Sequence, residues 1–448
     1  MGKLKSGSIL LDGNKEVYRR GDTVKGTVVL EVTEALTVKS VRVCLFGQTL
    51  VKWDEFNGKT TKDYISKENY LGHVVTVFGK RADETGPNVT LTAGNHRLRF
   101  IFVLPKEGNF PSSFEGEYGA IRFWLKMEVA KPFPGINKTW YRCITYLSDI
   151  NINQMMYKSP KSGRSAKTIS KFLGFGDAGT LTLAASTDRG AYCPGEKIAL
   201  SVIVKNNSSK DLGRLNAHFI QTVQYLANND TKERTSIFRA IGGEPVEKGG
   251  EQKWLNKHIQ VDAIPPTTKP STCHVILVKY HIKIFVEVPW GFNLEVWLPI
   301  TIGTIPLGHS TRSTQGATAS SFETDASSAI TYSKCNKGVQ RCSKSEGNFV
   351  NISYVPMCPY VVNYVFKPPS ARPANQRVAQ GARPRTTDQP TANTASVFSE
   401  KATIVATPPA REPTAPPSEE PPSYEEVLRM DNPDPDEIGK TGQKKPDA

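Results

Sequence analysis

Apolar and polar residues alternate along most of the first 307 residues. From Thr23 to Val32, and again from Ala120 to Ala130, most alternate side chains are apolar. Between Ile276 and Val288, seven alternate positions are apolar or aromatic. A period of two places one face of a strand on a core and the other face in water. Many such strands, separated by Gly, Pro and Asn clusters, predict an all-β protein built of antiparallel sandwiches.

A short motif occurs twice, which indicates two related units. The segment Tyr18–Val24 is echoed 174 residues later by Tyr192–Ile198, and both copies lead into an alternating strand. Gly21 and Gly195 take equivalent places, where a turn needs a backbone conformation that other residues resist. The repeat therefore predicts two β-sandwich lobes of related design.

Composition divides the chain into four parts. We expect a first lobe at residues 1–155, a basic linker at 156–177, a second lobe at 178–307 and a tail at 308–448. The tail holds 17 of the 31 prolines and cannot bury enough apolar surface to offset the entropy of ordering. We therefore expect it to be disordered. Tyr354–Phe366 is its most apolar piece and could dock onto a surface that the sequence does not identify.

The formal net charge of +14 lies almost wholly in the predicted lobes. The first 307 residues hold 41 basic and 28 acidic side chains, whereas the tail holds 16 and 15. A basic folded region suits the anionic cytosolic leaflet or phosphorylated tails of membrane proteins. An ordinary solvated surface is the alternative. Nucleic acid is not an expected partner, because aromatic stacking motifs and the folds that bind it are missing from the sequence.

Targeting signals are few, and they predict a cytoplasmic protein. Met1–Leu11 has too short an apolar core for a secretory signal, and no run of about 18 apolar residues occurs. The seven cysteines form no CxxC pair, which suits reduced thiols. Gly2 falls in a loose match to the myristoylation pattern, although an ordinary start to the first strand explains the same residues.

Residue patterns that carry catalysis are missing from the sequence. No GxxxxGK[ST], HExxH or GxSxG motif occurs, and the seven histidines do not reach metal-ligand spacing with the cysteines. Gly174–Gly179 has the spacing of a dinucleotide-binding loop, but alternating β-branched residues follow it instead of a helix. Cys273 and His274 are adjacent, so we expect them on opposite faces of one strand. We predict no enzyme activity, no cofactor and no metal site.

The strongest short motif is a PPxY sequence, Pro421-Pro422-Ser423-Tyr424, near the end of the tail. Prolines pre-set the extended left-handed helix, so docking into the aromatic groove of a WW domain costs little entropy. Tyr424 would be the selective anchor, and Val427 belongs to a short continuation that could turn against the same domain. A proline-rich linker with an incidental tyrosine is the alternative.

Several motifs, in the same order along the chain, resemble the α-arrestins, the arrestin domain-containing proteins. Gly21–Gly26 and Val38–Val41 are similar to the family's opening strands, and Ser113–Lys126 to the later part of its N-terminal lobe. Tyr192–Glu196, Asn206–Ser209 and Leu298–Leu307 are similar to its C-terminal lobe. The resemblance implies two arrestin-like β-sandwich lobes joined by a linker, with no catalytic activity.

The resemblance also implies a function and partners. Such proteins are adaptors that bind cytosolic parts of receptors or transporters and bring HECT-type ubiquitin ligases through WW domains. They promote ubiquitination, endocytosis and endosomal sorting. We therefore expect Pro421, Pro422, Tyr424 and Val427 to bind a WW domain, and the cytoplasmic protein to be recruited to the plasma membrane and endosomes. Many relatives carry two PPxY motifs where this chain has one, which puts multivalent ligase capture in doubt.

A redox or metabolic regulator is the alternative that the resemblance leaves open. It would act through a thioredoxin-type thiol interaction, with Cys273 as the candidate thiol. This cysteine lies where the chain resembles a redox-active strand region found within the family. A buried thiol is usually inert, so the exposure of Cys273 bears on this alternative.

Overall fold

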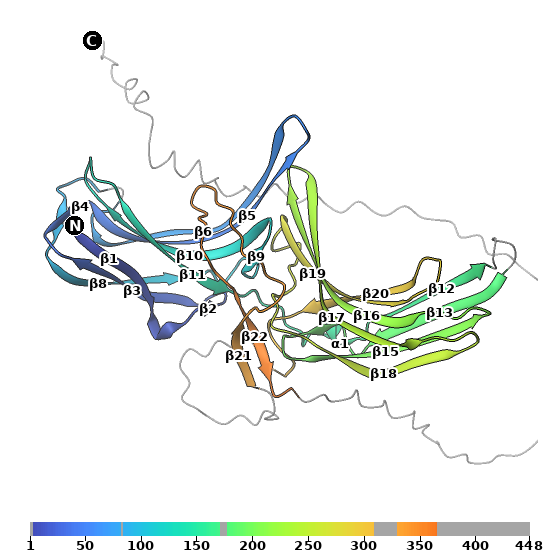
Figure 1. Ribbon diagram of the computed structural model, residues 1–448. Helices are drawn as coiled ribbons and strands as arrows, with labels where there is room; N and C mark the ends of the chain where they lie inside the picture. The colour runs from blue at the N-terminus through green and yellow to red at the C-terminus, as the bar shows by residue number, and fades with distance from the viewer. Residues whose placement is uncertain (1–2, 82–83, 171–176, 309–328, 365–448) are drawn as a thin grey trace, which may run out of the picture. The chain divides into compact units, whose positions relative to one another are not determined.

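Two antiparallel β-sandwich lobes and a C-terminal hairpin make up the folded chain (Figure 1). The computed structural model describes residues 3–81, 84–170, 177–308 and 329–364. Within these residues, helix is limited to α1 (Met155–Lys158) and a 3-10 turn, η1 (Asp12–Asn14). The all-β fold predicted from the alternating pattern is confirmed.

The N-terminal lobe packs two sheets face to face. Its smaller sheet has the order β1-β3-β8, and its larger sheet has the order β2-β11-β10-β5-β6 with β9 paired to β10. The strands are β1 (Leu4–Leu11), β2 (Val17–Tyr18), β3 (Thr23–Val32), β5 (Ser40–Phe56), β6 (Thr61–Gly79), β8 (Gly94–Val103), β9 (Phe114–Gly116), β10 (Gly119–Ala130) and β11 (Lys138–Tyr146). The short strands β4 (Leu36–Val38) and β7 (Val89–Leu91) pair with each other.

The C-terminal lobe repeats this plan with two sheets. One has the order β12-β13-β15-β18, and the other has the order β14-β20-β19-β16-β17. The strands are β12 (Ser162–Ser170), β13 (Asp177–Thr187), β14 (Ala191–Tyr192), β15 (Lys197–Ser208), β16 (Arg214–Ala227), β17 (Asp230–Pro245), β18 (Glu251–Gln260), β19 (Ile276–Val286) and β20 (Leu294–Ile302).

The repeated motif forms the same local structure in both lobes. β2 pairs in parallel with β11, and β14 pairs in parallel with β20. A turn follows in each lobe, with Gly21 at φ 75° and Gly195 at φ 91°. The next strand, β3 or β15, then sends alternate side chains such as Val28 and Val202 into the core. The duplication predicted from the sequence is therefore confirmed.

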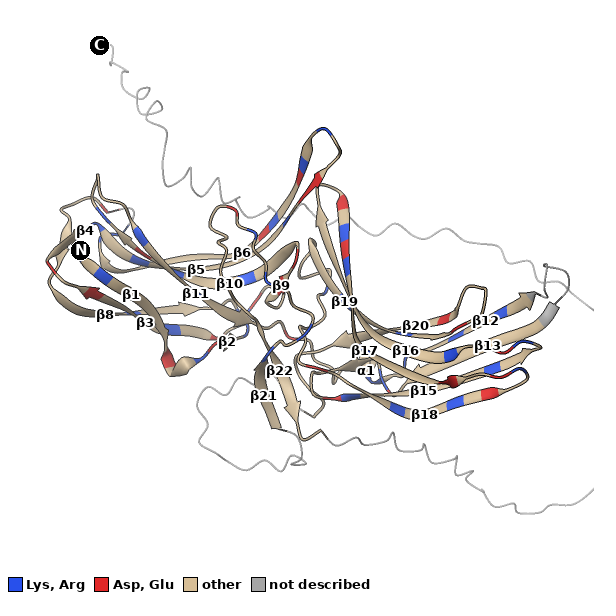
Figure 2. Ribbon diagram, viewed as in Figure 1, with Lys and Arg blue, Asp and Glu red and all other residues tan. Residues whose placement is uncertain are grey.

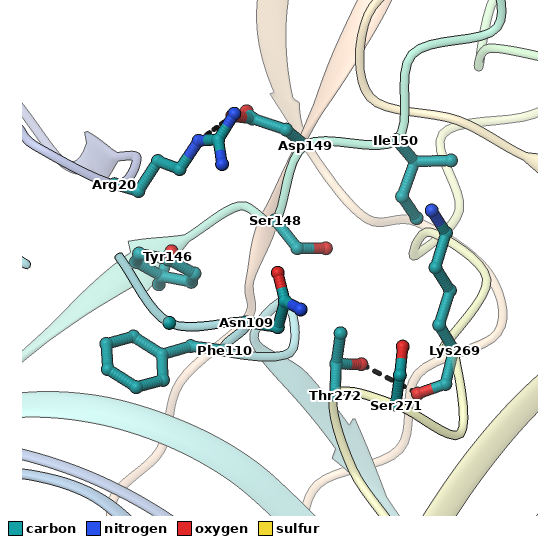
Figure 3. A pocket seen from close by; sticks show the side chains of 11 residues that line it. Arg20, Asn109, Phe110, Tyr146, Ser148, Asp149, Ile150, Lys269, Ser271 and Thr272 are labelled. Atoms are coloured by element: carbon teal, nitrogen blue, oxygen red, sulfur yellow. Dashed lines mark hydrogen bonds and ion pairs between the residues drawn. The ribbon is translucent and has the colours of Figure 1, made fainter. Parts of the chain in front are cut away.

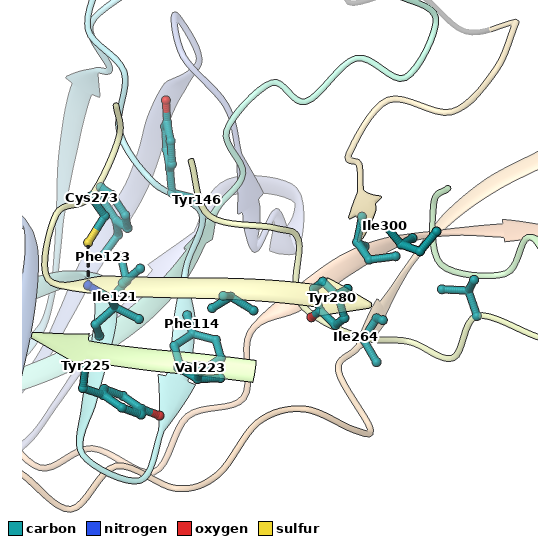
Figure 4. Close-up of a cluster of buried hydrophobic side chains, with 14 of the residues drawn as sticks. Phe114, Ile121, Phe123, Tyr146, Val223, Tyr225, Ile264, Cys273, Tyr280 and Ile300 are labelled. Atoms are coloured by element: carbon teal, nitrogen blue, oxygen red, sulfur yellow. Dashed lines mark hydrogen bonds between the residues drawn. The ribbon is translucent and has the colours of Figure 1, made fainter. Parts of the chain in front are cut away.

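One apolar core continues through both lobes. Phe114 and Phe123 from the N-terminal lobe belong to the same buried cluster as Val223 and Tyr225 from β16 (Figure 4). The ring of Tyr225 also packs edge-on against Tyr118, with 5.5 Å between the ring centres. Each fully buried side chain of this size contributes roughly 1.5–3 kcal/mol. Apolar packing therefore joins the two lobes as well as filling each one.

Part of the expected linker is a strand of the C-terminal lobe. β12 pairs antiparallel with β13 along its length, which extends the lobe into the span expected to connect the two lobes. Gly163 and Ser165 are partly buried, whereas Arg164 and Ala166 are exposed, and a Cβ at Gly163 would meet the side chain of Val296 in β20. Small residues occupy positions that are usually apolar in a strand, so the segment showed no strand pattern. Its basic residues therefore predicted a linker instead.

The chain after the second lobe folds back onto both lobes. We call residues 329–364 the strap. β21 (Ala329–Lys334) and β22 (Met357–Val362) form its antiparallel hairpin. The backbone N–H groups of Asn336, Gln340 and Val361 donate to the C=O groups of Ala263, Glu115 and Pro194. The folded unit thus extends past the expected boundary at residue 307 to Tyr364.

The expected docking of Tyr354–Phe366 is confirmed for its described part. The Tyr354 hydroxyl lies 2.5 Å from Thr145 Oγ1, and Val361 is almost wholly buried. Residues 365 and 366 lie outside the described residues, as do residues 309–328 and 367–448 of the predicted tail. The strap buries apolar side chains of its own against the lobes, among them Phe349, Cys358 and Val361.

We predict that Gly195→Ala loosens the strap and that Gly13→Ala does not. Both glycines have a positive φ, so alanine costs about 1–2 kcal/mol at either position. A Cβ at Gly195 would also collide with the C=O of Val361 in β22, whereas a Cβ at Gly13 meets nothing within 4 Å. Limited proteolysis of the full chain measures the difference, and cleavage within residues 335–364 should accelerate only in Gly195→Ala. Equal cleavage in the two variants would show that the strap does not rest on this turn.

Candidate functional site

Cys273, the thiol singled out from the sequence, lies at the seam between the lobes. Its Sγ is 3.8 Å from Thr49 Oγ1 of β5 and accepts a hydrogen bond from the N–H of Ile276 at 3.3 Å. The side chain is wholly buried in the shared core (Figure 4). Burial raises the pKa of the Cys273 thiol, and the negative charge of Glu68 adds to the increase. The thiol is therefore protonated and shielded, which suits packing better than thiol exchange.

His274 follows Cys273 and lies on the solvent side of the seam. Its backbone N–H and its ring Nδ1 are both 3.0 Å from Glu68 Oε1. Tyr70 donates its hydroxyl to the other oxygen of Glu68 at 2.7 Å. The expected pair of one buried and one exposed side chain is confirmed, but both residues lie in the turn before β19 and not on a strand. This turn closes the seam against β5 and β6.

A small polar hollow opens between the lobes close to this seam (Figure 3). Its volume is about 130 Å³, and Arg20, Asn109 and Asp149 line it from the first lobe. Lys269 and Ser271 line it from the second lobe. Both oxygens of Asp149 are engaged, one by Arg20 at 2.8 Å and the other by Arg19 at 2.9 Å. The cations outnumber the carboxylate, so the hollow has the electrostatics to accept a small anionic group.

The strap crosses the N-terminal lobe over a buried ion pair. Arg122 on β10 and Glu115 on β9 are 1% and 2% exposed, and Arg122 Nη2 donates to Glu115 Oε2 at 2.7 Å. The same guanidinium donates to the C=O of Cys342 at 2.9 Å and to that of Val350 at 2.7 Å. Phe349, between these two carbonyls, places its ring 4.8 Å from the guanidinium. Two backbone carbonyls of the strap thus complete the hydrogen bonding of a buried charge.

Arg122 and its surroundings form a buried site that the alternating pattern of the sequence did not predict. Alternation along Ala120–Ala130 had placed Arg122 on a solvated face, and the strap buries that face. Trp124 lies on it too and packs edge-on against Phe349, with 5.6 Å between the ring centres. Trp124 lies two positions from Arg122, on the face that the pattern predicts to be solvated. A tryptophan at such a position could have predicted that another segment of the chain packs over that face.

Two long hairpins, one from each lobe, meet at their ends. Near the connecting loops of the β5–β6 and β16–β17 hairpins, acidic and basic residues follow one another along the strands (Figure 2). Lys232 Nζ lies 3.1 Å from Glu55, and Lys62 Nζ lies 3.5 Å from Asp230. Both pairs are exposed to solvent, so they orient the hairpins more than they stabilise them. The hairpin ends form a charged surface to which both lobes contribute.

The loop between β19 and β20 exposes two large aromatic side chains. Trp290 is 106% exposed and Phe292 is 90% exposed. Lys167 of β12 donates its ammonium to the C=O of Phe292 at 2.7 Å. We call Trp290, Phe292 and Lys167 the aromatic tip. Exposed aromatic rings beside a cation suit the interface between lipid headgroups and acyl chains.

The predicted WW-domain ligands, Pro421, Pro422, Tyr424 and Val427, lie outside the described residues, and so does Gly2. In the part of the chain that the structure describes, no three His, Cys, Asp or Glu side chains gather in a group that could hold a metal ion. The helical turns of that part are too short to cross a membrane.

Comparison with known proteins places both lobes in one family. Residues 7–153 match the arrestin (or S-antigen) N-terminal domain, and residues 177–307 match the arrestin (or S-antigen) C-terminal domain. The chain is 29% identical to thioredoxin-interacting protein from Homo sapiens over 327 residues, which cover 72% of this chain and 80% of that protein. It is 28% identical to the Mus musculus protein of that name, over 72% of this chain and 79% of the relative.

The two matched domains coincide with the two lobes, in the same order, and β12 precedes the second match. The chain belongs to the α-arrestin family.

Proposed function

We propose that the protein is a trafficking adaptor without catalytic activity of its own. Its lobes would bind cytosolic parts of receptors or transporters, and its PPxY motif would recruit a HECT-type ubiquitin ligase through a WW domain. The observation that carries this proposal is the presence of a paired arrestin fold and one PPxY motif on the same chain. Ubiquitination of the bound membrane protein would then promote endocytosis and endosomal sorting.

The hollow between the lobes supports binding of an acidic or phosphorylated segment of the cargo. Arg20 and Lys269 reach it from different lobes, and Asn109 and Ser271 add polar groups. A carboxylate or phosphate group in the hollow would be attracted by more positive than negative charge. A cargo tail bound there would contact both lobes at once.

The aromatic tip supports a contact with the anionic cytosolic leaflet. Trp290 and Phe292 would enter the headgroup region, and Lys167 would add attraction for anionic lipid. Membrane contact of this kind would hold a cytoplasmic protein at the plasma membrane or at endosomes. It would also raise the local concentration of a ligase that a single short motif binds weakly.

A redox regulator is the second candidate, and the name of the relatives, thioredoxin-interacting protein, is the observation that favours it. In that function the thiolate of Cys273 would attack a disulfide of an oxidised thioredoxin-type partner, forming a mixed disulfide and releasing the partner's other sulfur as a thiolate. The complete burial and raised pKa of Cys273 weigh against this chemistry unless the seam opens. The adaptor proposal therefore ranks first.

We predict that Tyr424→Ala weakens ligase capture. A lone PPxY motif should bind on the order of micromolar, about −8 kcal/mol, because it offers few contacts. Loss of one anchor of about 2 kcal/mol weakens binding about thirtyfold. Titration of the full chain against isolated WW domains measures this, together with ubiquitination of co-expressed membrane proteins.

Two variants make that measurement specific. Pro369→Ala changes the Pro368-Pro369-Ser370 sequence, which lacks a tyrosine, and should bind WW domains like the wild type. Cys273→Ser should also leave ligase capture unchanged. If Tyr424→Ala binds and ubiquitinates normally while Cys273→Ser loses a thioredoxin-type partner, the adaptor proposal fails and the redox candidate replaces it.

We predict that the double variant Trp290→Ala, Phe292→Ala sediments less with vesicles that contain anionic lipid. Each substitution removes an apolar anchor, so the fraction of protein bound to the vesicles should fall at least about tenfold. Leu255→Ala is the matched control, because Leu255 is a similarly exposed apolar side chain of the same lobe. Equal binding of the wild type to neutral and anionic vesicles, or equal loss in the control, would contradict the proposed membrane contact.

A further inference from the structure

Two cysteines of the strap lie on the same face of its hairpin. In the register of β21 and β22, Cys358 stands opposite Ser333. The N–H of Cys335 donates to the C=O of Pro356 at 2.9 Å, which continues the ladder by two residues beyond Ser333. Side chains two residues apart on a strand share a face, so Cys335 is the diagonal neighbour of Cys358.

The two thiols share one small buried cluster. Cys335 is 4% exposed and Cys358 is fully buried, and both pack with Ala263 from the second lobe. A hydrogen bond between the two thiols, together with burial, raises the pKa of Cys335 well above its usual value. The S–H of Cys358 also faces the C=O of Ser333 at 3.6 Å. The two thiols therefore share one buried cluster, and neither forms a disulfide in the structure.

We propose that Cys335 and Cys358 are a modification site, a thiol pair that peroxide converts to a reversible disulfide which fastens the strap. Nothing in the adaptor function requires this pair, and the proposal stands apart from it. The position of the pair gives the bond its effect. The chain between the two cysteines contains Cys342 and Val350, whose carbonyls accept hydrogen bonds from Arg122.

The chemistry requires one molecule of hydrogen peroxide for each disulfide. One sulfur attacks the O–O bond, an S–O bond forms, and the first water leaves. The second sulfur then attacks the oxidised sulfur, the S–S bond forms, and the S–O bond breaks to release the second water. Two thiols lose two protons and two electrons in total, and the peroxide gains them.

Burial of the two thiols slows this reaction. Their closeness to each other determines that its product is a disulfide. Little thiolate is present at neutral pH because the pKa of Cys335 is raised, so the first attack is slow until the hairpin opens. Once one sulfur is oxidised, the neighbouring thiol reacts before further oxygen can add. The bond restricts the unfolded strap and thereby stabilises its docked form.

The test uses the full chain, first reduced and then treated with hydrogen peroxide. Free thiols are alkylated, and a tryptic digest is analysed by mass spectrometry. Trypsin cuts after Lys334, Lys337, Arg341 and Lys344, so the three cysteines Cys335, Cys342 and Cys358 fall in three different peptides. We expect a linked pair of peptides that contains Cys335 and Cys358, lighter by two hydrogens and separated by dithiothreitol. We also expect the Tm of the oxidised protein to rise by about 5 °C.

Cys335→Ser and Cys358→Ser should each abolish both the linked peptides and the rise in Tm, while Cys44→Ser on β5 should change neither. Tm values recorded in reductant show whether a serine variant still folds like the wild type. A link to any third cysteine, oxidation of either residue to sulfinic acid without the link, or an unchanged Tm in the linked protein would overturn the proposal. None of these readouts depends on a WW domain, so failure here leaves the adaptor proposal untouched.

Discussion

A buried guanidinium must have its hydrogen bonds satisfied, and the position of the strap follows from that requirement. Arg122 is 1% exposed, and Glu115 supplies only part of what it needs. The remaining partners are the backbone carbonyls of Cys342 and Val350, more than two hundred residues further along the chain. If the strap left, these two hydrogen bonds from a charged donor would be lost, and such bonds contribute about 1.5–3 kcal/mol each. The strap therefore cannot leave the lobe without a large penalty.

Fixing the strap has consequences for the function that we propose. The chain that follows it, with the single PPxY motif, starts from Tyr364, whose hydroxyl lies 3.4 Å from the guanidinium of Arg189 in the second lobe. Val361 is held on that lobe by Pro194, while Phe349 is held on the first lobe. One segment thus binds both lobes, and together with the shared core around Tyr225 it limits their independent movement. In the proposed function, the ligase-recruiting tail would follow directly from a segment that is bound to both lobes.

Much of the fold could be predicted because it depends on local patterns. Alternation in Ile276–Val288 and the repeated glycine turn at Gly21 and Gly195 are visible within a few residues, and both are confirmed. β12 was missed because Gly163 and Ser165 stand where its buried side would otherwise show apolar residues. The site was less predictable, because the partners of Arg122 are distant in sequence and a single sequence does not show which distant segments meet. Cys273 was found, but its burial depends on Thr49, another distant residue.

Amide hydrogen exchange in Arg122→Met tests the dependence of the strap on this buried charge most directly. Arg42→Met is the matched control, since Arg42 lies on the same sheet and pairs with Glu128 at 2.7 Å. We predict that exchange in residues 340–364 accelerates at least about a hundredfold in Arg122→Met only. β19 should stay protected in both variants. Unchanged protection of the strap in Arg122→Met, or equal loss in Arg42→Met, would contradict the account.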